Sequence, residues 1–325
     1  MRSCSSVAVA LALVFTTAST ARAQRFPFER TFEMQGVSTL DVSTMRGKIE
    51  VVAGAPGRVV VTGTATVRIA WDAPSNAVEL ARRVAGQPPI ERDGNTLRLR
   101  PPSDAAEQKA TTVSYTVRVP PDTDVRTDSD SGATSIRDVA GPVAVRTQSA
   151  AVDVANLGAA ATITTGSGAV RVDGVKGALS VTTSSSAFTG RSLEGDVRVR
   201  TSSGAVDAAL IGRGGVDVQT GSSAITVRGA RGGVIATSQS GRVTVAGVPG
   251  SAWTLSTSSS AIDIAVDKAA SLSLDASSRS GSVKVEGGEV RGDVSKNRIA
   301  GTIGDDGPLV RATSGSGSIL LTVGK

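Results

Sequence analysis

The segment VRVRTSSGAVDA (197–208) shows the pattern that decides the fold of this chain. Apolar residues alternate with polar or charged ones on both sides of a short run of Thr, Ser and Gly. The pattern returns as LSVTTSSSAFTG (179–190) and as VDVQTGSSAITV (216–227). Because successive side chains of a β-strand point to opposite faces, each copy predicts two short strands joined by a tight corner.

These copies belong to a repeat that extends through most of the chain. The small residue after a serine marks the corner, and 18 residues separate Gly168 from Ser186 and Ser186 from Gly204. Stacked copies of one such unit bury a continuous core, so the periodicity predicts an all-β, β-solenoid or β-helix-like fold with two short strands per repeat. The predicted corners are Gly132, Ala150, Gly168, Ser186, Gly204, Ser223, Gly241, Ser260, Gly281, Gly301 and Gly317.

Aligned on the corner, the repeats form columns of like residues. Positions seven before and two after the corner are mostly apolar, whereas the position three after it is variable and mostly polar, which predicts one buried and one exposed face. Ser or Thr stands three before the corner, and we expect these hydroxyls to form hydrogen bonds with the corner backbone. The hydroxyl column is Ser129, Thr147, Thr165, Thr183, Thr201, Thr220, Ser238, Thr257, Ser278 and Ser314.

Glycine alternates with a larger residue at the corner, as in Gly168, Ser186, Gly204 and Ser223. This alternation raises a second possibility, a 36-residue double unit in which alternate corners need a positive φ. The sequence leaves the choice between the two periods open, together with the handedness of the coil.

Residues 24–121 follow the pattern less regularly and are predicted to form an N-terminal β-rich cap on the solenoid of residues 122–325. Capping residues and apolar positions at helical spacing over 74–84 predict one helix in this cap. Pro120-Pro121 marks the join. The predicted strands of the cap span residues 32–42, 47–52, 58–69, 96–99 and 113–119.

Residues 1–23 have the layout of a secretory signal peptide. A short basic region precedes an apolar run over 7–15, and Ala21-Arg22-Ala23 forms an A-x-A cleavage site before Gln24. The apolar run is too short to span a bilayer. We therefore expect an exported mature chain without a transmembrane segment, located in the periplasm, at the cell surface or outside the cell. The one cysteine, Cys4, lies in the segment that cleavage would remove.

The formal net charge is +6, and Arg residues alternate with Asp and Glu along the chain. Aromatic residues make up 2% of the chain, so the scattered positive charge lacks the interleaved aromatics that stack on bases. This composition argues against specific nucleic-acid binding and favours weak attraction to anionic polymers of the cell envelope.

The residues needed for common catalytic chemistry are missing. The chain contains no histidine, which excludes Ser-His-Asp and Cys-His nucleophile systems and His-based zinc sites. Asp153, Asp207 and Asp263 share the outward column, but consecutive members lie about 14 Å apart, too far for a catalytic carboxylate pair. The serines occupy a repeated column and are interpreted as structural. We predict a non-enzymatic protein with no catalytic, cofactor-binding or metal-binding residues and no cofactor.

Two tryptophans and an acidic run are the remaining candidates for binding. Trp253 shares the inward column and is predicted to fill the core, and Trp71 is predicted to pack under the cap. The acidic run resembles part of a calcium loop, but Ala133 and Val139 stand where an EF-hand needs Gly and Glu. This run consists of Asp122, Asp124, Asp128 and Asp130.

The stretch from Tyr115-Thr-Val-Arg-Val-Pro-Pro-Asp through Asp130-Ser-Gly, followed by reiterated Gly-x-Val-x-Val units, resembles the DUF4097 family of β-strand repeat proteins. The resemblance covers nearly all of the mature chain, including the Gly47-Lys-Ile-Glu-Val strand. It implies a β-solenoid of bacterial, often extracytoplasmic, proteins without a defined catalytic site. Members of that family carry the label of adhesin, which is inferred from their architecture.

Three functions follow as hypotheses. The first is a structural or adhesin-like binding rod of the bacterial envelope, whose partner is an envelope protein, a polymer or a surface. The second is a carbohydrate-active enzyme of the β-helix type, which the missing histidine and the few aromatics disfavour. The third is a self-assembling envelope scaffold, in which the last strand, 318–323, leaves an exposed edge for end-to-end association.

Overall fold

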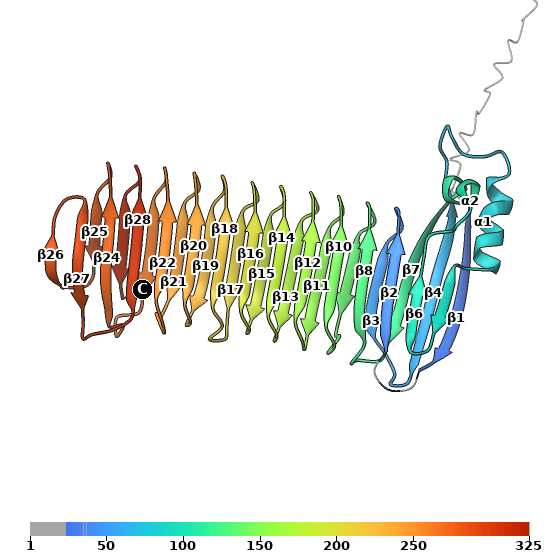
Figure 1. The fold of residues 1–325 in the computed structure, drawn as a ribbon, viewed down its shortest axis with the longest axis horizontal. Helices are drawn as coiled ribbons and strands as arrows, with labels where there is room; N and C mark the ends of the chain where they lie inside the picture. The colour runs from blue at the N-terminus through green and yellow to red at the C-terminus, as the bar shows by residue number, and fades with distance from the viewer. Residues whose placement is uncertain (1–23, 35, 37, 325) are drawn as a thin grey trace, which may run out of the picture.

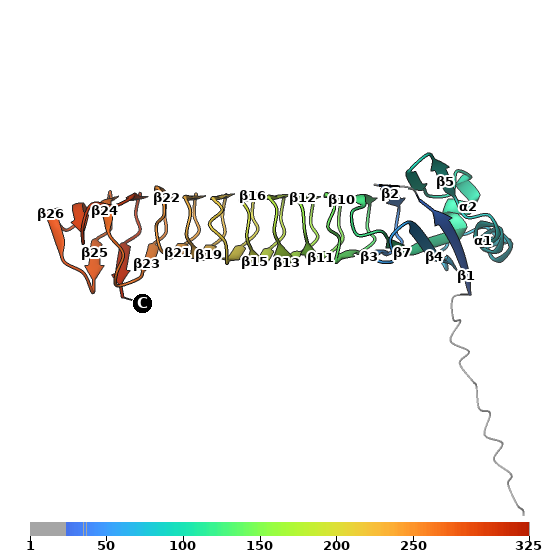
Figure 2. The same cartoon turned by 90° about the horizontal axis from the view of Figure 1, so that it is seen from below.

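The chain forms a straight rod built from two long β-sheets (Figures 1 and 2). The computed structural model describes residues 24–34, 36 and 38–324, so the predicted signal peptide lies outside the described residues. Sheet A contains 14 strands and sheet B contains 15, and each coil of the rod contributes one strand to each sheet. In the regular part of the rod the strands of each sheet are parallel and in register. The predicted β-solenoid is confirmed.

Each repeat supplies two strands, as the alternation of apolar residues predicts. In sheet B, Val197 of β16 lies beside Leu179 of β14 and Val216 of β18, so the inward column is continuous along the rod. The regular strands of sheet B are β8 (Asp124–Ser129), β10 (Val143–Thr147), β12 (Ala161–Thr165), β14 (Leu179–Thr183), β16 (Val197–Thr201), β18 (Val216–Thr220), β20 (Val234–Ser238) and β22 (Trp253–Thr257). Those of sheet A are β9 (Thr134–Arg137), β11 (Val152–Leu157), β13 (Val170–Val175), β15 (Phe188–Leu193), β17 (Val206–Leu210), β19 (Ile225–Ala230), β21 (Val243–Gly247) and β23 (Ile262–Val266).

The core between the regular strands is thin and consists of Val, Ile, Leu and Ala with two large aromatic residues, Phe188 and Trp253. Trp253 is fully buried, as predicted, and its Nε1 donates a hydrogen bond of 2.9 Å to the carbonyl of Gly232. The ring of Phe188 occupies the space that a side chain at Gly190 would need. Trp253 therefore fits into this core because its polar nitrogen has a hydrogen-bond partner, and Phe188 fits because Gly190 leaves room for its ring.

The hydroxyl column at the first corner forms the hydrogen bonds that the sequence predicts. Thr201 Oγ1 accepts a hydrogen bond of 2.9 Å from the backbone N–H of Gly204. Ser238 Oγ accepts one of 2.8 Å from Gly241 N–H and donates one of 3.2 Å to the carbonyl of Ser223 in the neighbouring coil. These buried hydroxyls thus form hydrogen bonds with backbone groups of the corner, which cannot bond within the sheets because the strands end there.

The alternation of residues at this corner has a steric cause. A Cβ added at Gly168 would lie 1.5 Å from the carbonyl oxygen of Ala150, and one added at Gly241 would lie 1.8 Å from that of Ser223. None of the corner glycines has a positive φ, so the positive φ suggested for alternate corners is wrong. Glycine is needed at every second corner because two backbones approach closely there, whereas the corners between them have room for Ser or Ala.

The second corner, where sheet A strands end, contains a column that the sequence analysis missed. Asp138, Asn156, Gly174 and Ser192 have φ values of 62°, 55°, 72° and 53°. The side chain of Asn156 donates a hydrogen bond of 2.9 Å to Asp138 Oδ1, one coil away. Asp, Asn and Gly tolerate the left-handed region better than other residues. Their recurrence just before an apolar residue was therefore the feature of the sequence that could have predicted this corner.

The cap covers the N-terminal end of the rod. The predicted helix is α1 (Ala77–Gly86), and a short second helix, α2 (Ala105–Ala110), begins after Asp104, whose side chain accepts hydrogen bonds from the N–H groups of Ala106 and Glu107. The predicted strand over 32–42 is instead divided between two elements, because β1 ends at Glu33 and β2 begins at Thr39. The strands here are β1 (Arg25–Glu33), β2 (Thr39–Thr44), β3 (Ile49–Ala53), β4 (Arg58–Val67), β5 (Ile90–Asp93), β6 (Thr96–Leu99) and β7 (Thr111–Val119).

Spatial order differs from chain order at this end of the rod. Strands β2 and β3 form a coil that lies between the pair β6 and β7 on one side and the pair β8 and β9 on the other. The coil of β2 and β3 therefore comes first in the chain. The strands that follow it up to β7 lie on its N-terminal side in the rod, and the strands from β8 onward extend the rod on its other side.

Trp71 does not pack under the cap, and that prediction is wrong. It lies between β4 and α1, and its exposed fraction is 99%. Ile69 nearby is 71% exposed. Leu80 and Val84 on the apolar side of α1 are buried beneath the helix, so this space is filled without Trp71.

The C-terminal strand does not form the end of the rod. The last strands are β24 (Leu272–Ser278), β25 (Val283–Glu286), β26 (Val290–Val294), β27 (Arg298–Ile303), β28 (Leu309–Ser314) and β29 (Ile319–Val323). β28 lies between β22 and β24, and β29 lies between β23 and β25. Figure 1 shows the C-terminus inside the rod and β26 at its tip. The prediction of an exposed edge at 318–323 is therefore wrong.

The inserted coil makes the same corner contact as the regular coils. In space the corner of Ser260 is followed by that of Gly317 and then by that of Gly281. A Cβ at Gly317 would lie 1.9 Å from the carbonyl oxygen of Ser260, so glycine follows serine here as elsewhere in the rod. Gly301, which was predicted to be a corner, lies within β27 instead.

We expect Gly168→Ala to destabilise the rod by about 1–3 kcal/mol, because the new methyl group overlaps a backbone oxygen that cannot rotate away. The midpoint of thermal unfolding measures the effect. Ser186→Ala, at the next corner, is the matched control, since the buried Oγ of Ser186 has no hydrogen-bond partner and its loss is expected to be neutral or slightly stabilising. Equal midpoints for the two variants would contradict the steric explanation.

Two Thr→Val substitutions should differ in their effect on stability, although both replace a buried hydroxyl with a methyl group. Thr201→Val removes the acceptor of the Gly204 N–H and should cost about 1–3 kcal/mol, because a buried donor loses its partner. Thr127→Val removes a buried hydroxyl that makes no hydrogen bond and should not lower stability. Denaturant unfolding of both variants beside the parent chain tests this, and a loss of stability in Thr127→Val would show that the interpretation is wrong.

Candidate functional site

The three outward aspartates of the sequence analysis lie on the outer face of sheet A, each paired with an arginine. Asp153 of β11 lies 3.9 Å from Arg171, and Asp207 of β17 forms an ion pair of 2.5 Å with Arg228. Asp263 of β23 likewise lies 2.5 Å from Arg242. Three strand intervals separate β11 from β17 and β17 from β23. The structure therefore brings each carboxylate to a guanidinium and does not bring the carboxylates together.

Two members of the acidic run at the start of the solenoid are also engaged within the chain. Asp124 forms an ion pair of 2.9 Å with Arg126, and Asp130 accepts a hydrogen bond of 3.3 Å from the side chain of Gln148. Within the described residues, no group of three or more His, Cys, Asp or Glu side chains has the arrangement to hold a metal ion.

A shallow, extended groove runs along the outer face of sheet B. It crosses five consecutive strands, β12, β14, β16, β18 and β20, and reaches the residue before β22, so it extends about 24 Å along the rod axis. Outward side chains form its upper part: Thr162, Ser180, Arg198, Asp217 and Ile235. The residues just before the strands form its floor: Ala160, Ala178, Asp196, Gly215, Gly233 and Ala252, with Asp196 accepting a hydrogen bond of 2.7 Å from the N–H of Gly215. We call this surface the sheet B groove.

Small residues create the groove. Where Gly or Ala precedes a strand, no side chain extends from the edge of the sheet, and the neighbouring outward residues form a wall beside the gap. Ile235 departs from the polar character of this outward position and is 48% exposed. An apolar residue between Val234 and Ala236 interrupts the alternation, and this was the signal in the sequence that could have identified the groove.

The middle of the groove carries a charge cluster. Asp217 accepts hydrogen bonds of 2.9 and 2.5 Å from the two terminal nitrogens of Arg200, and Arg198 Nε lies 3.4 Å from the same carboxylate. The hydrogen bonds from Arg200, followed by the nearby positive charges, hold the pKa of Asp217 below its usual value although partial burial opposes this. The carboxylate is therefore ionised at neutral pH, and the mostly exposed guanidinium of Arg198 is free to contact a bound group as well.

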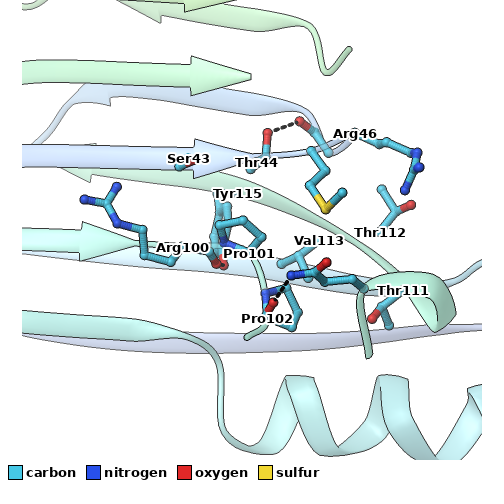
Figure 3. Close-up of a pocket in the computed structure, with 13 residues that line it drawn as sticks. Ser43, Thr44, Arg46, Arg100, Pro101, Pro102, Thr111, Thr112, Val113 and Tyr115 are labelled. Atoms are coloured by element: carbon cyan, nitrogen blue, oxygen red, sulfur yellow. Dashed lines mark hydrogen bonds between the residues drawn. The ribbon is translucent and has the colours of Figure 1, made fainter. Parts of the chain in front are cut away.

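A second, much smaller pocket lies where the cap meets the rod (Figure 3). Its cavity volume is about 20 Å³, enough for a water molecule and too small for a substrate. Tyr115 is buried beside it, and its hydroxyl lies 3.3 Å from the carbonyl of Arg100. Burial raises the pKa of Tyr115, so the phenol stays protonated. Arg100 in turn binds Asp41 through two hydrogen bonds and joins β6 to β2, which indicates a structural role.

Comparison with known proteins identifies no family for this chain. No family model and no curated protein matches it. Two solved structures resemble it, one described as "a putative cell adhesion protein" from Clostridium sporogenes and one as "a putative adhesin" from Bacteroides fragilis. The first is 10% identical, with 91% of this chain and 99% of the other covered and a TM-score of 0.21. The second is 12% identical, with 91% and 96% covered and a TM-score of 0.29. At TM-scores this low, neither similarity supports a statement about the function of this chain.

Asp217→Asn should lower stability by less than about 1 kcal/mol near pH 7, because ion pairs that solvent reaches contribute little. The pKa of Asp217 is depressed in the folded chain, so its contribution is fully present above the unfolded value near 4 and is lost as the pH falls through the lower folded value. Thermal unfolding from pH 7 to pH 2 should show the parent and Asp217→Asn converging below about pH 4.

The matched control for this prediction is Asp173→Asn on the outer face of β13. Asp173 forms no ion pair with another described residue, so this substitution should have no comparable pH-dependent effect. A parent and an Asp217→Asn variant that stay equally far apart from pH 7 to pH 2 would contradict the proposed ion pair.

Proposed function

We propose that this chain is an exported, non-enzymatic protein of the bacterial envelope that acts as an adhesin-like binding rod, with the sheet B groove as its binding surface. The observation that carries the proposal is the groove itself, which is open, about 24 Å long and lined by neutral hydroxyls, small residues, the charged side chains of Asp196, Arg198 and Asp217, and one exposed isoleucine. The signal-peptide layout of residues 1–23 and the resemblance to the DUF4097 family support export and the bacterial setting.

Binding suits these surfaces better than catalysis does. Glycoside hydrolysis needs two carboxylates within about 9.5 Å of each other, whereas Asp153, Asp207 and Asp263 lie three strand intervals apart and each pairs with an arginine. The charge cluster of the groove has the same character, since Arg200 keeps Asp217 ionised. The carbohydrate-active alternative would also need aromatic platforms beside the groove, but Trp253 and Phe188 of the repeat coils are buried, and the exposed Trp71 lies on the cap.

The shape and chemistry of the groove indicate an extended partner. Ile235 offers an apolar contact at one end, and Thr162 and Ser180 offer hydroxyl donors and acceptors at the other. Between them, the exposed guanidinium of Arg198 can bind a carboxylate or another anionic group. An extended segment of an envelope protein or polymer, with an anionic group near its middle, would satisfy all three regions at once.

Site-specific photo-crosslinking in the producing bacterium tests the proposal. A photoreactive amino acid at Ile235 should give crosslinked species, whereas the same amino acid at Thr226, on the outer face of sheet A one strand along the chain, should give few or none. Arg198→Glu combined with the probe at Ile235 should lower the yield by about tenfold, because it removes the contact with the anionic group. Equal crosslinking at both positions, or none at Ile235, would reject the groove as the binding surface.

No described residue belongs to a membrane-crossing helix, since none of the helices in this part of the chain is both long and apolar enough. On the signal-peptide layout of residues 1–23, the proposed location is the periplasm, the cell surface or the exterior. Fractionation of the producing cells, with detection of the chain in each fraction, distinguishes these compartments.

A further inference from the structure

Four strands end the two sheets of the rod: β1 and β25 in sheet A, and β5 and β26 in sheet B. Both ends of sheet A are protected against pairing with another chain. β1 contains Pro27, which has no N–H to donate. In β25, the N–H of Val283 donates a hydrogen bond of 2.9 Å to the carbonyl of Lys296, in the turn between β26 and β27. This leaves the two ends of sheet B, β5 and β26, as candidates for pairing.

The outer edge of β26 is open along the strand, which lies at the C-terminal tip of the rod (Figures 1 and 2). β26 pairs on one side with β27, and its backbone forms no hydrogen bond with a described residue on the other side. Val290 is half-buried, whereas the other four residues of the strand are exposed. Val294 lies level with the buried Ile299 of β27, so it points to the core side of the sheet, and yet it is 62% exposed. The open edge therefore leaves an apolar side chain without a neighbour.

The sequence of β26, Val-Arg-Gly-Asp-Val, complements itself about Gly292. When two copies of a strand pair antiparallel about a two-fold axis perpendicular to their sheet, the residue on the axis lies level with its own copy. With Gly292 on the axis, Arg291 lies level with the partner's Asp293, and Val290 lies level with the partner's Val294. Level side chains on neighbouring strands point to the same face. The joint thus forms two charge pairs on the outer face of sheet B and two valine pairs on its core face.

The neighbouring registers and the other open edge bring like charges together. If Arg291 or Asp293 is on the axis, that residue lies level with its own copy and the two charges repel. The central residues of β5 are Glu91 and Arg92, so every two-fold pairing centred within that strand has the same defect. Opposite charges on the two sides of an uncharged central residue therefore distinguish β26 as an edge that fits a second copy of itself.

The charged groups of β26 are available for these contacts. Neither Arg291 nor Asp293 forms an ion pair with another described residue. One terminal nitrogen of Arg291 donates a hydrogen bond to the carbonyl of Gly304. A guanidinium has five N–H donors, so this bond leaves donors for a carboxylate of the second copy.

We propose that two copies of this chain join end to end by antiparallel pairing of β26 with β26, about a two-fold axis that is perpendicular to sheet B and passes beside Gly292. Sheet B then continues from the cap of one copy to the cap of the other. The pairing uses the same edge in both copies and leaves neither edge open, so the assembly closes at two chains and does not grow into a filament.

The orientation of the axis has a consequence for the sheet B groove. A two-fold axis perpendicular to sheet B places the outer faces of both copies on the same side of the joined rods. The groove of each copy ends at the residue before β22, and β28, β24 and β27 separate β22 from the joint. Both grooves therefore stay open and face the same way. The dimer would hold an extended partner at two points, an expectation that rests on the proposed function of the groove.

Light scattering after size exclusion, over a range of concentrations and without any ligand, tests the joint separately from the groove. We expect the mass of the parent chain to rise towards twice the monomer mass with concentration. Arg291→Asp and Asp293→Arg each place like charges at both pairs and should raise the dissociation constant about tenfold or more. An equimolar mixture of these two variants should form the dimer again, because one chain then contributes two acidic side chains and the other contributes two basic ones.

Lys284→Glu on β25 is the matched control, since it changes the net charge as much as Arg291→Asp does but lies outside the joint. It should leave the dimer unchanged. Circular dichroism and the thermal midpoint of each variant show whether it is folded. A parent chain that stays monomeric up to its solubility limit overturns the joint, and so does a mixture of the two variants that associates no better than either variant alone. A normal dimer whose Ile235 probe gives no crosslink would reject the proposed function and leave the joint intact.

Discussion

The close approach of one backbone corner to the next is the constraint on which this rod depends. At every second corner of the regular coils the Cα of a glycine lies against a carbonyl oxygen of the coil before it, and no side chain fits between them. Beside this contact, a buried Ser or Thr hydroxyl binds the N–H of the corner residue. The two features together keep successive coils at the spacing of a β-sheet, and the parallel ladders and the apolar columns follow from that spacing.

The same contact also forms between coils that are not consecutive in the chain. Gly317 lies against Ser260 as the glycines of the regular coils lie against their neighbours, and the last coil occupies a place that the chain passed earlier. At the other end, the coil of β2 and β3 is formed first and is then enclosed between later strands. Both termini of the repeat array are thereby held inside the rod, and the strands that remain at its C-terminal tip are the irregular ones.

The surfaces for function are places where the repeat departs from its own rule. Regular outward positions carry Arg, Asp, Thr and Ser, and these pair with each other across neighbouring coils. The sheet B groove arises where small residues precede five strands and where Ile235 replaces a polar residue. The C-terminal tip arises where an antiparallel hairpin replaces a complete coil. A uniform solenoid would offer the same weak contacts along its whole length, whereas these departures give the rod positions at which a partner can bind specifically.

The sequence by itself determined the two strands of each repeat, the inward columns with Trp253, and the hydroxyl column at the corner. These features follow from the alternation of side chains over a few residues and from a short spacing that repeats, so local reasoning reaches them. Only the tertiary structure decided that β29 lies between β23 and β25, that Trp71 is exposed, that glycine alternates for steric reasons, and that sheet B extends past sheet A. Each of these depends on which distant segments become neighbours, and strand pairing between distant segments is set by the fit of their surfaces rather than by their order along the chain.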